Sequence, residues 1–373
     1  MKKLAIVTTH PIQYYAPVFK LLASHVNLKV FYTAGEKTGY DKSFQQIIHW
    51  DIPLLQGYAY QFLKNKAKCP GTHHFMGIQN PDAIEQLTAF KPTHLLIYCW
   101  SNYSHLKILR HFKGKIPILF RGDSTLLNKQ SWFNNIWKTP ILKCIFKNLD
   151  IALFVGTNNK AYFKKFGLRE DQLIFAPHAI DNNRFAEKHP INLRQRLGLA
   201  NAAILILFAG KLAPIKNPQL LLEAFLKLNQ PDVHLLFVGN GIMETVLKKS
   251  SKQYSHVHFL PFQNQSMMPA VYQSCDLFCL PSKSETWGLS INEAMASAKA
   301  ILASDKVGAA IDLISVVNGK KFKSNDLADL IEKLKEMTES KANLKANGEA
   351  SKTIIAKWNF DTQIKQILNA IHS

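Results

Sequence analysis

The chain has 373 residues, of which 47% are hydrophobic, and its 46 Lys and Arg residues against 26 Asp and Glu residues give a net charge of +20. This length exceeds the roughly 250–300 residues that one hydrophobic core holds, and no run approaches the ~18 apolar residues of a membrane-spanning helix, so we expect two domains and no transmembrane segment. The five cysteines are scattered and do not form the pattern of a zinc site, so we expect no bound metal. The apolar run at residues 4–7 is too short for a signal peptide, so we expect a cytoplasmic protein.

The first half of the chain alternates short apolar runs with amphipathic stretches. This alternation is typical of parallel strands joined by helices and predicts a Rossmann-like sheet. The expected strands are residues 4–10, 28–33, 94–100, 117–122 and 151–156. Positive charge is concentrated in this half, because residues 1–180 contain 23 Lys and Arg against 9 Asp and Glu, a balance of +14. The partners of this half are therefore expected to be anions, such as phosphates or acidic lipids.

Polar and aromatic residues follow the first of these strands. His10, Gln13 and Tyr14 lie just beyond it, and open α/β sheets bind their ligands at the carboxyl ends of their strands. We therefore predict that these three residues line a ligand cleft. The alternative is that Pro11 begins a helix, with His10 near its cap and the tyrosines packed.

Two later strand ends carry further candidates. Arg121 and Asp123 follow the strand at 117–122, and Trp100 with Ser101 follows the strand at 94–100. For Arg121 and Asp123 we predict a catalytic role, the alternative being an internal salt bridge and a turn. Trp100 is a weaker candidate for the cleft.

A tryptophan- and lysine-rich stretch covers residues 130–147. It combines Trp132, Trp137 and Phe146 with Lys138 and Lys143, a mixture that suits a lipid headgroup interface. The alternative is an ordinary helix packed on the sheet. Together with the charge of this half, the stretch favours attachment to an anionic membrane surface.

The second half repeats the alternation after a polar break near residues 177–190. Its expected strands are residues 203–211, 233–240, 257–262, 276–282 and 300–305. Two such sheets predict two Rossmann-like domains separated by a cleft. Residues 340–373 are expected to be helical, with the segment from about Trp358 crossing back onto the first domain.

Residues 210–225, GKLAPIKNPQLLLEAF, follow one of these strands and open a helix. A helix N-terminus presents free N–H groups and the positive end of a dipole, and Lys211 and Lys216 add two cations there. This combination predicts a diphosphate site, although lysines that simply face water would give the same pattern.

Two glutamates mark the stretch 281–304. Glu285 follows the strand at 276–282, and Glu293 lies eight residues further on, inside a helix that begins near Leu289. Carboxylates accept hydrogen bonds from vicinal hydroxyls, which suits a ribose or hexose diol, and Gly288 lets a ligand approach the backbone. A helix-capping role is the alternative for such acidic residues.

Over nearly all of residues 175–320 the chain resembles the retaining glycosyltransferases of family 4, which have the GT-B fold. The likeness rests on PHAIDNNRF (177–185), GKLAPIKNP (210–218), FVGNG (237–241) and SETWGLSINEAMA (284–296). The opening THPIQYYAPVFKLLA (9–23) is similar to a bacterial surface-polysaccharide subset of that family.

The resemblance implies a role for each matching residue. Lys211 and Lys216 would bind the donor diphosphate, Glu285 the transferred sugar and Glu293 the ribose. Lys216 and Glu285 are thereby also catalytic candidates. The backbone amides around Trp287, Gly288 and Leu289 would hold sugar or phosphate oxygens, and Gly239 belongs to the glycine turn beside the donor.

The chain departs from the family pattern at several positions. Lys211 stands where the family usually has Arg, and Gly308-Ala309 replaces a Gly-Gly pair. Residues 298–300 replace its Gly-x-Pro, and the glycine-rich loop often found after the first strand is absent. The turns and backbone contacts at these positions are therefore in doubt, whereas the charge at Lys211 is kept.

The resemblance predicts an acceptor-binding domain of residues 1–182 plus about 357–373 and a donor-binding domain of residues 188–356. The expected activity is metal-independent retaining transfer of a sugar from a nucleotide diphosphate to a glycan or lipid-linked acceptor in surface-polysaccharide synthesis. A nucleotide-sugar epimerase or a phosphorylase of the same fold remains an alternative. A dehydrogenase is disfavoured because Glu244 stands at the third position of a G-x-G-x-x-G fingerprint, and a nucleic-acid binder because the basic residues are dispersed.

Overall fold

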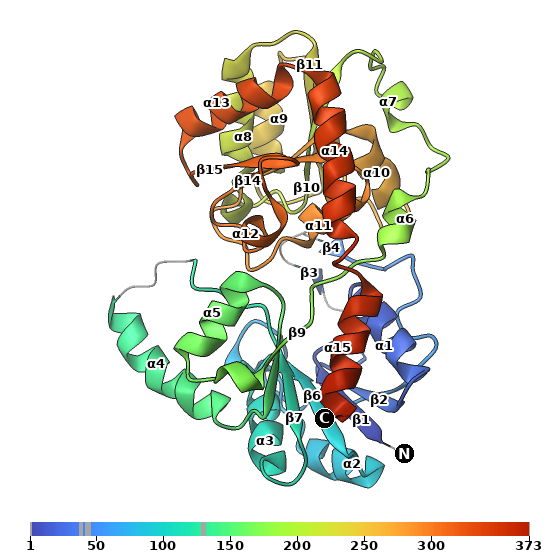
Figure 1. Ribbon diagram of the computed structural model, residues 1–373, viewed down its shortest axis with the longest axis vertical. Helices are drawn as coiled ribbons and strands as arrows, with labels where there is room; N and C mark the ends of the chain where they lie inside the picture. Colours follow the sequence, from blue (N-terminus) through green and yellow to red (C-terminus); the bar gives the residue numbers. More distant parts are fainter. Residues whose placement is uncertain (1, 37–39, 42–45, 128–131, 373) are drawn as a thin grey trace. The chain divides into compact units, whose positions relative to one another are not determined.

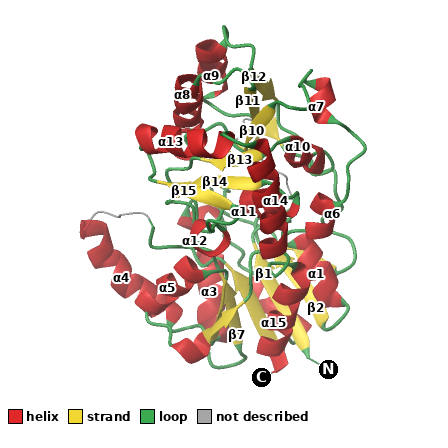
Figure 2. Ribbon diagram, turned by 45° about the horizontal axis from the view of Figure 1, so that its top comes forward, coloured by secondary structure: helices red, strands yellow, loops and turns green. Residues whose placement is uncertain are grey.

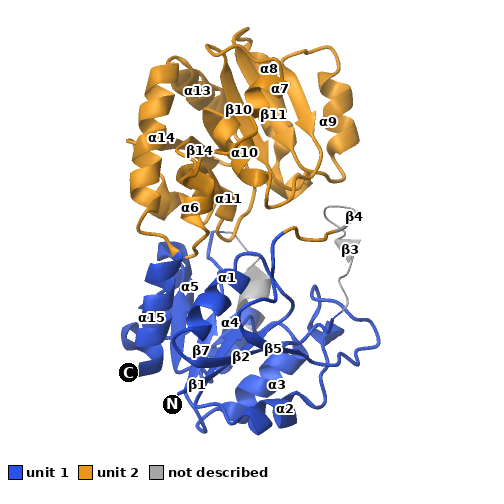
Figure 3. Ribbon diagram, turned by 90° about the vertical axis from the view of Figure 1, so that its right-hand side faces the viewer, with its two compact units in different colours: residues 1–38, 52–177, 360–373 blue, residues 39–51, 178–359 orange. Residues whose placement is uncertain are grey.

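The computed structural model describes residues 2–36, 40–41, 46–127 and 132–372. The chain forms two compact units (Figure 3). Unit 1 comprises residues 1–38, 52–177 and 360–373, and unit 2 comprises residues 39–51 and 178–359. The first boundary was expected after residue 182 and the last at about residue 357. The assignment of residues 39–51 to unit 2 was not anticipated.

Unit 1 is built on a seven-stranded sheet in the order β5-β2-β1-β6-β7-β8-β9, in which every pair of neighbours is parallel. Ile6 pairs with Val30 on one side and Leu96 on the other, so β1 is central. The strands are β1 (Lys3–Thr8), β2 (Asn27–Tyr32), β5 (Ala59–Phe62), β6 (His94–Tyr98), β7 (Ile118–Arg121), β8 (Ile151–Phe154) and β9 (Leu173–Phe175).

Helices cover both faces of this sheet (Figure 2). They are α1 (Ala16–Ala23), η1 (Phe75–Gly77), α2 (Ala83–Phe90), α3 (Tyr103–Phe112), α4 (Trp132–Phe146), α5 (Thr157–Lys165), η2 (Glu170–Gln172) and α15 (Phe360–His372). The spacing of Ile364, Ile367 and Ile371 forms an apolar stripe on α15, which packs with Leu4 and Val18 in one core of unit 1. Helix α15 lies beside α1 (Figure 1). The C-terminal helix therefore belongs to unit 1, as predicted.

Unit 2 contains a six-stranded parallel sheet in the order β12-β11-β10-β13-β14-β15. Its strands are β10 (Ile204–Ala209), β11 (Val233–Val238), β12 (Val257–Leu260), β13 (Leu277–Leu280), β14 (Ala300–Ser304) and β15 (Gly319–Phe322). Its helices are α6 (Asn182–Ala186), α7 (Leu193–Arg196), η3 (Pro214–Lys216), α8 (Pro218–Leu228), α9 (Glu244–Ser251), α10 (Met268–Ser274), α11 (Leu289–Ala296), α12 (Ala310–Leu313), α13 (Leu327–Thr338) and α14 (Lys341–Ile355).

Residues 39–51 add a two-stranded antiparallel ribbon, β3 (Tyr40–Asp41) with β4 (Gln46–Ile47). The end of this segment is attached to unit 2. The Trp50 ring lies 6.2 Å from that of Phe262, and Asn264 Nδ2 donates to His49 O at 2.6 Å. The end of the segment between β2 and β5 therefore contacts the loop that follows β12.

All ten expected strands are present, because strands buried on both faces read as continuous apolar runs. The strands that were missed in the two parallel sheets are short edge strands, β5, β9 and β15, and the ribbon of β3 and β4 was missed as well. In the part of the chain that the structure describes, no helix is long and apolar enough to cross a membrane.

Candidate active site

The predicted phosphate segment follows β10, and the loop that carries Glu285 follows β13; these two strands are neighbours in the sheet. Lys216 closes η3, immediately before α8, and its ammonium forms an ion pair with Glu285 Oε2. Only 24% of the Lys216 side chain and 17% of the Glu285 side chain are exposed. The structure thus brings together a lysine and a glutamate that are 69 positions apart in the sequence.

The charge state of Lys216 is tuned by its surroundings. Burial and the nearby Lys211 ammonium lower the pKa of Lys216 to about 8, although contact with the Glu285 carboxylate favours the charged form. At neutral pH Lys216 is therefore protonated, with two cations and one carboxylate close together. An incoming anion relieves the repulsion between the two lysines.

The loop that carries Glu285 is fixed by backbone hydrogen bonds on both sides. Lys283 N donates to Ile215 O at 2.8 Å, which fastens this loop to η3. Glu285 N donates to Lys306 O at 3.1 Å, and Gly308 N donates to Glu285 O at 3.0 Å. The Glu285 carboxylate therefore projects from a loop held between the lysine segment and residues 305–308.

Helix α11 begins directly after this loop. Gly288 is its N-cap and has a φ of 97°, a left-handed conformation that favours glycine. The amide groups of Leu289 and Ser290 lie in the first turn, where N–H groups have no acceptor within the helix. This helix start can therefore bind oxygen atoms of an anion or a sugar, and the ligand role of residues 287–289 stays a prediction.

Trp287 anchors the start of α11. Its side chain is only 3% exposed, and its Nε1 donates to Asn292 Oδ1 at 3.0 Å. Asn292 Nδ2 in turn donates to His178 O at 3.0 Å, and the Trp287 ring lies 5.1 Å from that of Trp358. The side chain of Trp287 is thus structural, which leaves its backbone for ligand contacts.

Glu293 lies one turn into α11 and is 3% exposed. Its Oε2 accepts a hydrogen bond from Tyr272 OH at 2.7 Å. The carboxylate is therefore held in place by α10, and its ribose role remains a prediction.

The glycine turn after β11 lies beside the lysine segment. Gly239 N donates to Leu260 O at 3.0 Å, and Leu212 N donates to Asn240 O at 2.9 Å. A Cβ atom at Gly239 would come within 2.1 Å of Gly210 O. A side chain at residue 239 is therefore incompatible with this approach of the two loops.

Three residues near this site were not identified from the sequence. Asn292 and Tyr272 position Trp287 and Glu293, as described above. Asn217, between Lys216 and α8, has a φ of 55° and is 6% exposed, and its Nδ2 has no hydrogen-bond partner among the described residues. Of these three residues, only Asn217 could have been suspected from the sequence, because it is next to Lys216. The role of Tyr272 depends on its contact with Glu293, which is distant in the sequence.

In unit 1 the predicted cleft residues lie at the carboxyl ends of neighbouring strands. His10, Gln13 and Tyr14 follow β1, Trp100 follows β6 and Asp123 follows β7. His10 is exposed, and the other four are half-buried. Their roles remain predictions.

Helix α1 begins at Ala16, with Pro17 in its first turn, and not at Pro11. Tyr15, which was not singled out from the sequence, is half-buried and packs against Tyr98, with a ring-centroid distance of 4.7 Å. Burial and the Asp123 carboxylate raise the pKa of Tyr15. The carboxylate after β7 therefore acts electrostatically on a tyrosine that follows β1.

Arg121 requires a correction. The residue is 1% exposed, and its Nη1 and Nη2 donate to Ala176 O at 2.8 Å and Pro177 O at 2.9 Å. The guanidinium therefore binds the main chain just after β9 and does not face a ligand. The predicted catalytic role is not supported, and the anticipated alternative, an internal salt bridge, is replaced by hydrogen bonds to carbonyl groups.

Helix α4 covers most of the stretch 130–147. Its C-terminal half packs in the core of unit 1 through Leu142, Ile145 and Phe146, whereas Ile141 is 54% exposed. Residues 130–131 and the side chains of Trp132 and Trp137 lie outside the described residues. The described half supports the alternative of an ordinary packed helix.

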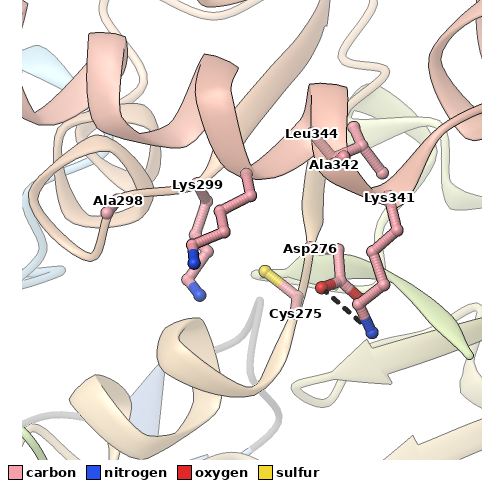
Figure 4. Close-up of a pocket in the computed structure, with 8 residues that line it drawn as sticks. Cys275, Asp276, Ala298, Lys299, Lys341, Ala342 and Leu344 are labelled. Atoms are coloured by element: carbon pink, nitrogen blue, oxygen red, sulfur yellow. Dashed lines mark ion pairs between the residues drawn. The ribbon is translucent and has the colours of Figure 1, made fainter. Parts of the chain in front are cut away.

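A separate cavity of about 330 Å³ lies at the opposite edge of the unit 2 sheet, before β13 and β14 (Figure 4). Lys341 and Asp276 form an ion pair of 3.6 Å there, beside Cys275 and Lys299. Burial raises the pKa of Cys275 to about 12, which makes it an unreactive thiol. The cavity contains none of the predicted site residues, so it is not part of the candidate active site.

Known proteins resemble the chain in both sequence and structure. Residues 191–351 match the family described as glycosyl transferases group 1. A D-inositol 3-phosphate glycosyltransferase of Nocardia farcinica is 28% identical in an alignment of 178 residues, and the match covers 44% of this chain and only 39% of that relative. A GDP-mannose-dependent monoacylated alpha-(1-6)-phosphatidylinositol monomannoside mannosyltransferase of Corynebacterium glutamicum is 23% identical in an alignment of 246 residues, and the match covers 62% of this chain and 64% of that relative.

A solved structure extends the likeness to the whole chain. The crystal structure of Anabaena HepE in complex with UDP and glucose has a TM-score of 0.72 and 18% sequence identity, and the match covers 100% of both chains. The predicted likeness to the family 4 glycosyltransferases and the predicted fold are confirmed. The chain has the GT-B fold, and its residues 191–351 form a domain of the glycosyl transferases group 1 type.

Proposed function

We propose that the protein is a glycosyltransferase that moves a sugar from a nucleotide diphosphate to a glycan or lipid-linked acceptor, with retention of anomeric configuration. The observation that carries this proposal is the pairing of Lys216 with Glu285, beside Lys211 and at the start of α11. Cations for a diphosphate and a carboxylate for a sugar lie next to each other. The relatives support a nucleotide-sugar donor, since one is named for its dependence on GDP-mannose and HepE was solved with UDP.

In this proposal the leaving diphosphate is stabilised by fixed positive charge. As the bond between the sugar and the phosphate breaks, negative charge develops on the phosphate oxygens next to Lys216, Lys211 and the first turns of α8 and α11. Preorganised donors of this kind are each worth about 2.7–4 kcal/mol in a transition state. Glu285, released from Lys216 when the diphosphate binds, accepts hydrogen bonds from the sugar hydroxyls.

We further propose that no divalent metal takes part, since the two lysines supply the positive charge. Transfer is then unaffected by EDTA and not increased by Mg²⁺ or Mn²⁺. We also propose that the protein is cytoplasmic, acts at the inner membrane surface and takes part in the synthesis of a cell-surface polysaccharide. The positive balance of +14 over residues 1–180 supports this location.

The experiment that tests the proposal is a screen of nucleotide sugars followed by product analysis. A ligand at about 100 times its dissociation constant adds about 2.7 kcal/mol of stability, so the donor is found by thermal shift. The best donor is then incubated with membrane extract as the acceptor source, and products are identified by mass spectrometry and NMR. Transfer with retained configuration supports the proposal. An isomerised nucleotide sugar would identify an epimerase, and formation of a sugar phosphate when inorganic phosphate is supplied would identify a phosphorylase.

The affinity for UDP is expected to fall as pH rises above about 8. Below this pH Lys216 is protonated and binds phosphate. Above it, the free enzyme must first take up a proton at Lys216, and this proton uptake weakens binding by up to about tenfold per pH unit. Calorimetric titrations from pH 7 to 9.5 measure the slope. The control is Lys216→Arg, whose guanidinium stays charged, so its binding lacks this component; identical slopes for both proteins would contradict the role of Lys216.

A further inference from the structure

The loop between β5 and α2 presents apolar side chains to solvent on a rigid frame. Phe75 and Met76 are 41% and 48% exposed, and Tyr103 at the start of α3 is 41% exposed. The Phe75 and Tyr103 rings touch edge to face, with centroids 6.2 Å apart. Phe75 and Tyr103 therefore form one apolar patch, contributed by two elements of unit 1, and the exposed Met76 is next to Phe75 in the chain.

The frame of this loop is built by hydrogen bonds across its base. Asn65 Nδ2 donates to Gly77 O at 2.9 Å, and Asn65 Oδ1 accepts from Gln79 N at 2.9 Å. Lys66 N donates to Gln79 O at 2.8 Å. Phe75 and Met76 are therefore held outward by a closed loop and are not the ends of a loose segment.

Two further contacts fix the tip of the loop. Gly71 N donates to Gly77 O at 3.1 Å, and a Cβ atom at Gly77 would lie only 2.0 Å from Gly71 O. Ser104 Oγ, in the first turn of α3, accepts from Asn80 N at 2.7 Å. The loop is therefore joined to α3, which explains why Tyr103 completes the patch.

The charged residues of this loop have a single sign. Residues 64–76 contain Lys64, Lys66 and Lys68 and no Asp or Glu. All three lysines are exposed, and none of them forms an ion pair with another described residue. Lys107 and Arg110, also exposed, continue the positive charge along α3 from Tyr103.

We propose that residues 64–76 together with Tyr103, named the 64–76 surface, dock the protein on an anionic lipid bilayer. Phe75 and Met76 would enter the headgroup region, and the lysines would lie over acidic headgroups. Exposed apolar side chains on a loop that also carries exposed cations match such an interface in both polarity and charge. A site for a soluble anion would explain the lysines but not the exposed Phe75 and Met76.

This location differs from the one expected from the sequence. The described half of α4 turns Leu142, Ile145 and Phe146 into the core, whereas the 64–76 surface turns its apolar residues outward. The inference extends the proposed function by naming the surface that approaches a membrane-bound acceptor. Vesicle binding needs neither donor nor turnover, so its failure would leave the transfer reaction itself untouched.

The test is sedimentation of the full chain with vesicles of phosphatidylcholine containing phosphatidylglycerol, at a series of salt concentrations. Replacing Lys64, Lys66 and Lys68 by Gln should weaken binding about 100-fold at low salt, because each lysine near an anionic leaflet contributes roughly 1 kcal/mol. Phe75→Ser with Met76→Ser should weaken it about tenfold or more at every salt concentration, because insertion of apolar groups is not screened.

Matched controls lie in unit 2. Replacing Lys335, Lys345 and Lys352 by Gln removes the same charge from exposed positions of α13 and α14, and Ile311→Ser with Val316→Ser removes two exposed apolar side chains. Both controls should bind vesicles within about threefold of the wild type. Unchanged UDP affinity and melting temperature in the loop variants show that they are folded.

Two results would overturn the inference. One is no binding of the wild type to anionic vesicles at low salt. The other is binding that survives both sets of loop substitutions and is lost in Trp132→Ala with Trp137→Ala, which would move the contact to α4.

Discussion

Glu285→Gln is expected to lower kcat by about 10²–10³ while the affinity for UDP changes by less than about threefold. The substitution keeps the shape of the side chain and removes the charge next to the position at which the sugar leaves the phosphate. Loss of one preorganised group in an active site typically costs this much turnover. Steady-state kinetics with the identified donor and calorimetry with UDP measure the two effects separately.

The control for this variant is Glu244→Gln. Glu244 also pairs with a lysine, Lys248, but on the exposed surface of α9, so its substitution should leave kcat unchanged. If Glu285→Gln retained normal turnover, the assignment of Glu285 to the sugar would be wrong, and with it the centre of the proposed function.

Lys216→Ala is expected to weaken UDP binding by about 10–150-fold, because a hydrogen bond to a charged group is worth about 1.5–3 kcal/mol. Lys216→Arg should recover most of the affinity, and Lys248→Ala should have no effect. Calorimetry with UDP measures each variant, and thermal unfolding tests whether Glu285, deprived of its partner, destabilises unit 2. Wild-type affinity in Lys216→Ala would mean that the diphosphate binds elsewhere.

The two substitutions should not be additive. Each removes half of the same ion pair, so each changes the surroundings of the other residue before any ligand binds. The double variant Lys216→Ala with Glu285→Gln measures this coupling.

The proximity of Lys216 and Glu285 could be predicted from the sequence because both follow apolar runs that end a strand. β10 and β13 pair directly, with Ile206 opposite Leu277, so their carboxyl ends meet at one edge. A parallel sheet with helical crossovers allows few other arrangements, and polar residues after adjacent strands are then neighbours.

Arg121 shows where this reasoning fails. It too ends a buried strand, but its guanidinium turns to the carbonyl groups of Ala176 and Pro177, which follow the short strand β9. A run of three apolar residues such as β9 is too short to predict a strand. The carbonyl groups that accept hydrogen bonds from Arg121 could therefore not be located from the sequence. β5 and β15 were missed for a related reason, since sheet edges carry exposed polar residues that interrupt the apolar pattern.

Helix α15 has a consequence for how the protein is made. Ile364, Ile367 and Ile371 fill the core that β1 and α1 share, yet the ribosome adds them only after all of unit 2. During synthesis the side chains of Leu4, Ile6 and Val18 therefore lack the packing of α15, while unit 2 is already able to fold. The nascent first unit is accordingly the part that chaperones must protect from aggregation.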